Sequence, residues 1–315
     1  MGADRPARQS GGAGAGSLSR SVTDQGIDTR LAAWAAEFEE TLRATLVPDP
    51  EVPPELAEAV LYSIQAGGKR VRPYIVTRFC ELCGGTAEQA APAAVAIECI
   101  HAFSLVHDDL PAMDDDDMRR GRPTTHKAYG EAVAILAGDA LATVAYEILG
   151  RIPDPATAIA AVVELARGTG WAGMIGGQTV DILSEGREPQ LALVERIHRY
   201  KTARLFESAA KLGAISAGAD ERFMAAATRF GVELGRAFQI ADDLLDVTGE
   251  AAAMGKAVAK DAEAGKQTYP AVLGIEESRR AAEAAMTAAI DALQVFGPEA
   301  DDLRDLARFV VTRKK

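Results

Sequence analysis

The chain has 315 residues, of which 48% are hydrophobic but only 5% aromatic, so its core must consist mainly of Ala, Leu, Val and Ile. This composition favours helices. The formal net charge of −12 argues against a nucleic-acid partner, because phosphate backbones require basic surfaces. The sequence contains no run of 18 or more apolar residues, so it predicts no membrane span.

The first segment, residues 1–27, is rich in Gly, Ser, Ala and Arg and has no apolar signal-peptide core, so we expect a disordered tail. From Asp28 or Thr29, the expected N-cap, apolar residues recur at helical spacing. The expected helical stretches are 28–46, 53–68, 70–83, 88–108, 128–150, 155–171, 188–213, 220–247, 267–293 and 298–313. No segment alternates like a strand, and we predict one all-α domain over residues 28–315 without an internal linker.

Three cysteines, Cys80, Cys83 and Cys99, bear on metal binding and on the compartment. The pair in CELC has no second pair at the spacing of a zinc site, so small buried side chains are expected instead. An odd number of cysteines without a secretory pattern indicates a reducing, cytoplasmic location.

Two acidic motifs each follow a strongly apolar helical run. The first, HDDLPAMDDDDMRRGRPTTH, begins its aspartates at Asp108 and includes Asp114, and the second, QIADDLLD, runs from Asp242 to Asp246. Residues four apart share a helix face, so Asp242 and Asp246 would repel each other unless a cation lay between them. A lone acidic run is most often a solvated surface, but duplication in the same context favours a site for a hard cation. Oxygen-only ligands suit Mg²⁺, which substrate phosphates typically complete.

Four basic clusters accompany the acidic motifs. They contain Lys69 with Arg72, Arg119 with Arg120, Lys201 with Thr202, and Lys256 with Lys266. Each alone is more often a solvated surface, but four of them in an acidic chain indicate anionic ligands, since Arg and Lys bind phosphate oxygens. If helical, Lys69 and Arg72 would share a face. The stretch GMIGGQTVD, with Gln178 and Asp181, would by itself indicate a turn and a cap, and GDAL indicates close helix packing.

With these motifs the chain resembles the trans-polyprenyl diphosphate synthases, most closely the bacterial farnesyl diphosphate synthases. The resemblance covers about residues 30–312. The matching blocks, in the order found in that family, are GGKRVRP, HDDLPAMDDDDMRRGRPTTH, GDAL, GGQTVD, YKT, QIADDLLDVTG and GKQTYPAVLG. The resemblance implies an all-α fold of about ten helices around a deep cavity, with the two aspartate motifs facing each other across its mouth.

The resemblance also implies roles for individual residues. Three Mg²⁺ ions are expected, with the principal ligands Asp108, Asp114 and Asp242, and with Asp109, Asp243 and Asp246 in support. Residues near the allylic diphosphate would be Arg119, Lys201, Thr202, Gln239, Lys256 and Lys266. Residues holding isopentenyl diphosphate would be Lys69, Arg72, His101 and Arg120. The residues expected to take part most directly in catalysis are Asp108, Asp114, Lys201 and Asp242.

The reaction implied by the family is ionisation of an allylic diphosphate, attack by isopentenyl diphosphate and loss of a proton, carried out by a homodimer. In that family the residues before the first motif form the floor of the product cavity. Phe103 lies five residues before Asp108, about 7.5 Å along a helix, and Ser104 lies four before it. A bulky ring there, with the insertion Pro111-Ala112, indicates farnesyl diphosphate as the product.

Three alternatives stay open at this point. A geranylgeranyl diphosphate synthase would use the same motifs and differ in product length. A class I terpene cyclase would carry an Asn/Ser/Glu second motif instead of DDLLD, and a non-catalytic partner subunit would have lost acidic or basic motif residues.

Overall fold

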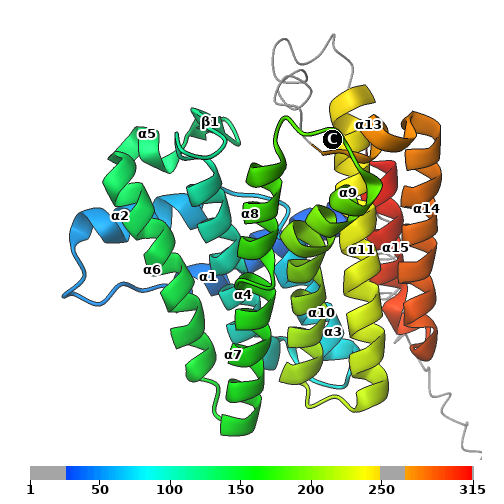
Figure 1. Ribbon diagram of the computed structural model, residues 1–315. Coiled ribbons are helices and arrows are strands. Elements are labelled where there is room, and N and C mark those ends of the chain that lie inside the picture. Colours follow the sequence, from blue (N-terminus) through cyan, green and yellow to red (C-terminus); the bar gives the residue numbers. More distant parts are fainter. Residues whose placement is uncertain (1–25, 249–266, 314–315) are drawn as a thin grey trace, which may run out of the picture.

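The computed structural model describes residues 26–248 and 267–313, and nearly all of them lie in helices (Figure 1). The first four helices are α1 (Ile27–Thr45), α2 (Pro54–Ile64), α3 (Val71–Leu82) and α4 (Ala87–Asp108). After a short hairpin, β1 (Met118–Arg119) and β2 (Arg122–Pro123), come α5 (Thr125–Tyr129), α6 (Glu131–Gly150), α7 (Pro155–Thr169) and α8 (Met174–Ser184). The last elements are α9 (Leu191–Ile197), a π-helix (His198–Ala203), α10 (Arg204–Ser216), α11 (Glu221–Thr248), α13 (Tyr269–Leu273), α14 (Ile275–Ala292), two 3₁₀ turns (Leu293–Val295 and Pro298–Ala300) and α15 (Asp301–Thr312).

The long helices pack into one bundle, which confirms the all-α expectation. Helix α4 lies at its centre, in contact with α3, α6 and α10, while α11 packs against α10 and α14. Helix α4 starts at a capping box in which Thr86 and Gln89 bond each other's backbone amides. Its central side chains, from Ala93 to Ile100, are all fully or almost fully buried. A helix that is apolar on every side belongs in the core, and this position fixes the place of the aspartates at its end.

Within residues 26–248 and 267–313, two helices, α4 and α6, are long and apolar enough to cross a membrane by length and composition alone. For α4, 67% of the apolar window is buried inside the protein, as expected of a core helix. For α6 the buried share is only 39%. Apolar side chains on α6 therefore remain at the surface.

Helix α8 was not expected, because the Gly-rich sequence GMIGGQTVD predicted a turn. The structure shows why position 177 is a glycine: a Cβ there would lie 2.1 Å from the backbone nitrogen of Lys201. The glycine thus lets α8 approach the π-helix closely, and it does not break the helix. A Cβ at Gly138 would lie 2.2 Å from Nε2 of His107, which confirms close helix packing at GDAL.

Two other local features differ from the expectation. The hairpin was not predicted, and its two turn residues, Arg120 (φ 52°) and Gly121 (φ 76°), both have positive φ, as a type I′ turn requires. Helix α1 begins one residue earlier than expected, after Gly26, and no side chain caps it. The N-cap expected at Asp28 or Thr29 was therefore wrong.

Candidate active site

The two aspartate motifs lie at the same end of the bundle. Asp108 is the last residue of α4, and Asp242 lies near the end of α11; both helices finish at the end where β1 and α13 lie (Figure 1). The loop after α4 folds back, since the amide of Asp114 donates to the carbonyl oxygen of Asp108 at 2.8 Å. The expected ligands Asp108 and Asp114 are thereby held next to each other.

The carboxylate of Asp108 is held by α8. Gln178 Nε2 donates to Asp108 Oδ1 at 2.9 Å, and one turn further along α8 Asp181 Oδ2 accepts from Nζ of Lys201 at 2.5 Å. Burial raises the pKa of Asp108 to about 6, with Lys201 opposing the shift and the carboxylate of Asp114 adding to it. Lys201 lies in the π-helix, a distortion that often occurs at functional sites. Gln178 and Asp181 thus orient two expected site residues, a role that the turn interpretation missed.

The second aspartate of each motif points into protein contacts. Asp109, which is 3% exposed, accepts from Nε of Arg119 at 2.7 Å. Asp243 accepts from the backbone amide of Tyr269 at 2.9 Å, lies 3.2 Å from Nε2 of His198, and accepts from Gln239 at 3.2 Å. These two carboxylates therefore hold other residues in place.

The same network includes Thr202, whose hydroxyl donates to Gln239 Oε1 at 2.7 Å. Thr202, Gln239 and Asp243 thus form one chain of hydrogen bonds from the π-helix to α11. The structure brings together two of the residues expected near the allylic diphosphate. Lys256 and Lys266, which the loop after the second motif was expected to contribute, lie outside the described residues.

Asp242 forms an ion pair with Arg313, which follows the last turn of α15 and whose guanidinium also stacks on the ring of Phe238. Burial raises the pKa of Asp242, and the cation of Arg313 opposes the shift. Arg313 was not among the site residues expected from the sequence, because only the packing of α15 against α11 places it beside the second motif.

A basic pocket of about 380 Å³ lies between α3, α4 and the hairpin, and it brings together all four residues expected to hold isopentenyl diphosphate. Its charged or titratable lining residues are Lys69, Arg70, Arg72, Glu98, His101, Arg120 and Arg313. Burial lowers the pKa of Arg72 to about 10, and burial together with the neighbouring arginines holds the pKa of His101 well below its usual range. His101 is therefore a neutral hydrogen-bonding group among cations, and the pocket is built for an anion.

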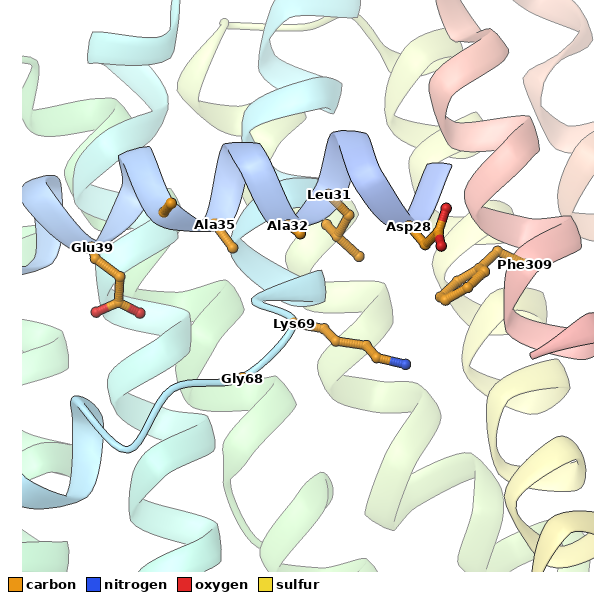
Figure 2. Close-up of a pocket in the computed structure, with 9 residues that line it drawn as sticks. Asp28, Leu31, Ala32, Ala35, Glu39, Gly68, Lys69 and Phe309 are labelled. Carbon is orange, nitrogen blue, oxygen red and sulfur yellow. The ribbon is translucent and has the colours of Figure 1, made fainter. Parts of the chain in front are cut away.

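Lys69 does not share a helix face with Arg72, contrary to the expectation. Helix α3 begins only at Val71, and Arg70 before it has a left-handed conformation with φ 48°. Lys69 extends between the basic pocket and a second, more apolar pocket of about 320 Å³ along α1 (Figure 2). Its ammonium lies 5.1 Å from the centre of the Phe309 ring. Burial and the charge of Arg313 lower the pKa of Lys69.

The donor set of Asp108, Asp114 and Asp242 fits a hard divalent cation. All three side chains are carboxylates, and burial raises the pKa of Asp108 and Asp242, so a nearby cation would offset the cost of their charge in the folded protein. Close by, Oε1 of Gln178 is buried and has no hydrogen-bond partner among the described residues. Oxygen atoms of this kind suit Mg²⁺.

Phe103 and Ser104 lie on α4, little more than one turn before Asp108. The Phe103 ring packs against the core and meets the His107 ring edge to face, with centroids 4.9 Å apart. The Ser104 hydroxyl donates to the carbonyl oxygen of His101 at 2.9 Å.

These observations define an all-α protein with paired carboxylates and a basic pocket at one end of its bundle. The family described as polyprenyl synthetase matches residues 53–299, and the chain belongs to this family. It is 41% identical to farnesyl diphosphate synthase of Escherichia coli (strain K12) over 294 residues, which cover 91% of this chain and 98% of that protein. It is 45% identical to geranylgeranyl pyrophosphate synthase 9, chloroplastic, of Arabidopsis thaliana over 269 residues, which cover 83% of this chain and 75% of that protein.

Among solved structures, the chain is similar to an FPP/GFPP synthase from Zymomonas mobilis, with a TM-score of 0.80 and 38% identity. That similarity covers 91% of this chain and 99% of the other. The fold and the prenyltransferase family are therefore established. Because the relatives include both farnesyl and geranylgeranyl diphosphate synthases, the product has to be argued from this chain's own residues.

Proposed function

We propose that the protein is a Mg²⁺-dependent farnesyl diphosphate synthase, which condenses isopentenyl diphosphate with dimethylallyl and geranyl diphosphates. The observation that carries the proposal is the arrangement at one end of the bundle: the carboxylate of Asp242 pairs with Arg313, which also lines the basic pocket built for an anion. One diphosphate would lie against the metal ligands and Lys201. The other would lie in the pocket with Lys69, Arg72, His101 and Arg120.

Divalent ions held by Asp108, Asp114 and Asp242 would supply positive charge that stabilises the departing diphosphate. Lys201, oriented by Asp181, would donate to the same oxygens, and Arg119 would approach them while Asp109 fixes its guanidinium. His101, neutral in its cationic surroundings, would donate a hydrogen bond to the second substrate. The buried apolar residues of α4 would exclude water, which would otherwise trap the allylic cation as an alcohol.

The product length rests on Phe103. Its ring lies on the helix that ends at Asp108, less than two turns before the expected metal ligand, so a prenyl chain growing into the bundle along α4 would meet it. The bacterial relative named farnesyl diphosphate synthase supports this assignment. The plant relatives support geranylgeranyl diphosphate as the second candidate product.

The activity is tested by incubating the purified protein with dimethylallyl diphosphate and radiolabelled isopentenyl diphosphate. We expect Mg²⁺-dependent incorporation of label into an acid-labile prenyl product and loss of incorporation with a chelator. Asp108→Asn should lower the rate by about a hundredfold or more, since it would weaken the binding of an ion that stabilises the departing diphosphate. Glu147→Gln, which changes an exposed carboxylate on α6, is the matched control and should leave the rate unchanged. An absence of label in the product of the unaltered protein would rule out the proposal.

We also propose that two copies associate through the surface formed by α6, α7 and α8. Among the described residues, most exposed large apolar side chains lie on these helices or, in the case of Trp171, between α7 and α8: Ile135, Leu136, Ile159, Val163, Trp171, Ile175, Ile182 and Leu183. Monomeric proteins rarely expose so many neighbouring apolar groups, and burial against a second copy would remove them from water.

The three cysteines are free, in keeping with a reducing compartment such as the cytoplasm.

A further inference from the structure

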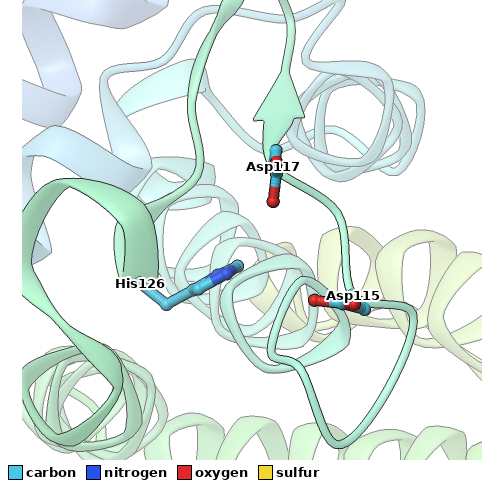
Figure 3. Close-up of side chains that lie close together, drawn as sticks. All are labelled: Asp115, Asp117 and His126. Carbon is cyan, nitrogen blue, oxygen red and sulfur yellow. The ribbon is translucent and has the colours of Figure 1, made fainter.

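The base of the hairpin holds a group of side chains that the proposed reaction does not use: Asp115, Asp117 and His126 (Figure 3). One carboxylate oxygen from each aspartate and one ring nitrogen of the histidine lie within 4.8 Å of one another. Figure 3 shows the His126 side chain extending toward the space between the two carboxylates. Asp115 and Asp117 are exposed, whereas His126 is only 6% exposed.

The histidine supplies the observation that points to a ligand. Its Nε2 atom is buried and has no hydrogen-bond partner among the described residues. A buried ring nitrogen normally has a partner, because leaving it without one costs free energy. A bound cation would supply the partner that Nε2 of His126 lacks among the described residues.

The neighbouring threonine favours one position for the ring proton. The carbonyl oxygen of Asp116 is the nearest acceptor for the single proton of the Thr124 hydroxyl, at 2.8 Å, and with the proton there the hydroxyl accepts from Nδ1 of His126, 3.1 Å away. In the neutral ring Nδ1 is then protonated and Nε2 holds the lone pair. This is the arrangement found around metal-binding histidines, whose second nitrogen donates to a neighbouring oxygen.

We propose that Asp115, Asp117 and His126 bind a divalent transition-metal ion at a site separate from the carboxylates of Asp108, Asp114 and Asp242. A donor set of one imidazole and two carboxylates favours ions such as Mn²⁺ or Zn²⁺ over Mg²⁺, which prefers oxygen ligands only. Lys127 pairs with Asp117 Oδ1 at 2.8 Å. Because the Lys127 side chain is 43% exposed, its ammonium can move into solvent when the ion binds.

This site lies at the base of the hairpin that carries Arg120 into the basic pocket. Asp117 directly precedes β1, and its carbonyl oxygen accepts from the amide of Thr124 at 3.0 Å, which joins the two ends of the hairpin. His126 lies two residues after Thr124. An ion between Asp117 and His126 would close the base of the hairpin whose turn carries Arg120. The ion would therefore hold the hairpin in the orientation that places Arg120 in the basic pocket.

The test uses Mn²⁺ as the probe, one equivalent added to the full chain in the presence of excess Mg²⁺, which occupies the oxygen-only site. Pulsed electron paramagnetic resonance should then show coupling between Mn²⁺ and a ¹⁴N nucleus, which no ligand set of aspartates can produce. His126→Asn should abolish the coupling, and His107→Asn should keep it. Asp117→Asn should weaken Mn²⁺ binding about tenfold or more, whereas Asp116→Asn, between the two aspartates, should not.

Two results would overturn the site. One is the absence of ¹⁴N coupling in the unaltered protein, which does not depend on any variant folding. The other is coupling or affinity that persists unchanged in both His126→Asn and Asp117→Asn. Neither result would affect the proposed prenyl transfer, which the label-incorporation assay tests separately.

Discussion

The adjacent carboxylates Asp242 and Asp243 should respond to removal in opposite ways. In Asp243→Ala, the amide of Tyr269 and Nε2 of Gln239 lose their acceptor, and Nε2 of His198 loses the carboxylate that lies 3.2 Å away. Tyr269 and His198 are 1% and 4% exposed, so water cannot replace the carboxylate. A buried polar group left without a partner costs about 1–3 kcal/mol, so we expect a loss of roughly 3 kcal/mol of unfolding free energy.

Asp242→Ala should cost little stability. Burial raises the pKa of Asp242, which means that the folded protein disfavours its charge. Its partner Arg313 keeps its stacking on the Phe238 ring and its place in the wall of the basic pocket when the carboxylate is gone. Prenyl transfer should instead fall by about a hundredfold or more, because an expected metal ligand is lost.

Calorimetry and urea unfolding measure the first effect. A loss of roughly 3 kcal/mol corresponds to a fall in Tm of about 6–10 °C in a domain of this size. The Tm of Asp243→Asn should fall less, because the amide side chain keeps one oxygen acceptor. Label incorporation measures the second effect. Equal Tm values for Asp242→Ala and Asp243→Ala would refute the division of the pair into one site carboxylate and one structural carboxylate.

Three further predictions concern other parts of the molecule. Phe103→Ala should lengthen the main product by at least one five-carbon unit, seen by chromatography, while Ser104→Ala should not; an unchanged product would place the cavity floor elsewhere. Ile135→Glu on α6 should shift the protein toward the monomer in sedimentation experiments, and a monomeric unaltered protein would contradict the proposed interface. Burial raises the pKa of Cys80 and Cys83 to about 11, so both should react slowly with a thiol reagent at pH 7 and fast after unfolding; fast reaction in the folded state would contradict their burial.

The sequence predicted the long helices from their apolar residues and from the Gly and Pro residues between them. Helix α4 is an example, since its apolar run ends at Asp108 as expected. It did not predict α8, where Gly177 serves a close contact between helices that only the fold creates. The hairpin was missed for a related reason, because Arg-Gly at its turn is a weaker signal than the usual Asn-Gly.

The motifs identified the expected site residues, but they did not show which of them face the site and which hold other residues in place. Adjacent aspartates on one helix differ by about 100° in direction, so Asp242 faces Arg313 while Asp243 faces Tyr269. Sequence spacing alone cannot say which of the two faces the site. Arg313 lies 71 residues from Asp242, and no local pattern connects them.

Chromatography of the dephosphorylated products is the measurement that tests the proposed function most directly. The purified protein, given Mg²⁺, isopentenyl diphosphate and dimethylallyl diphosphate, should yield farnesol as the main alcohol. Geranylgeraniol as the main alcohol would contradict the role given to Phe103, and the absence of any prenyl alcohol would contradict the proposed reaction.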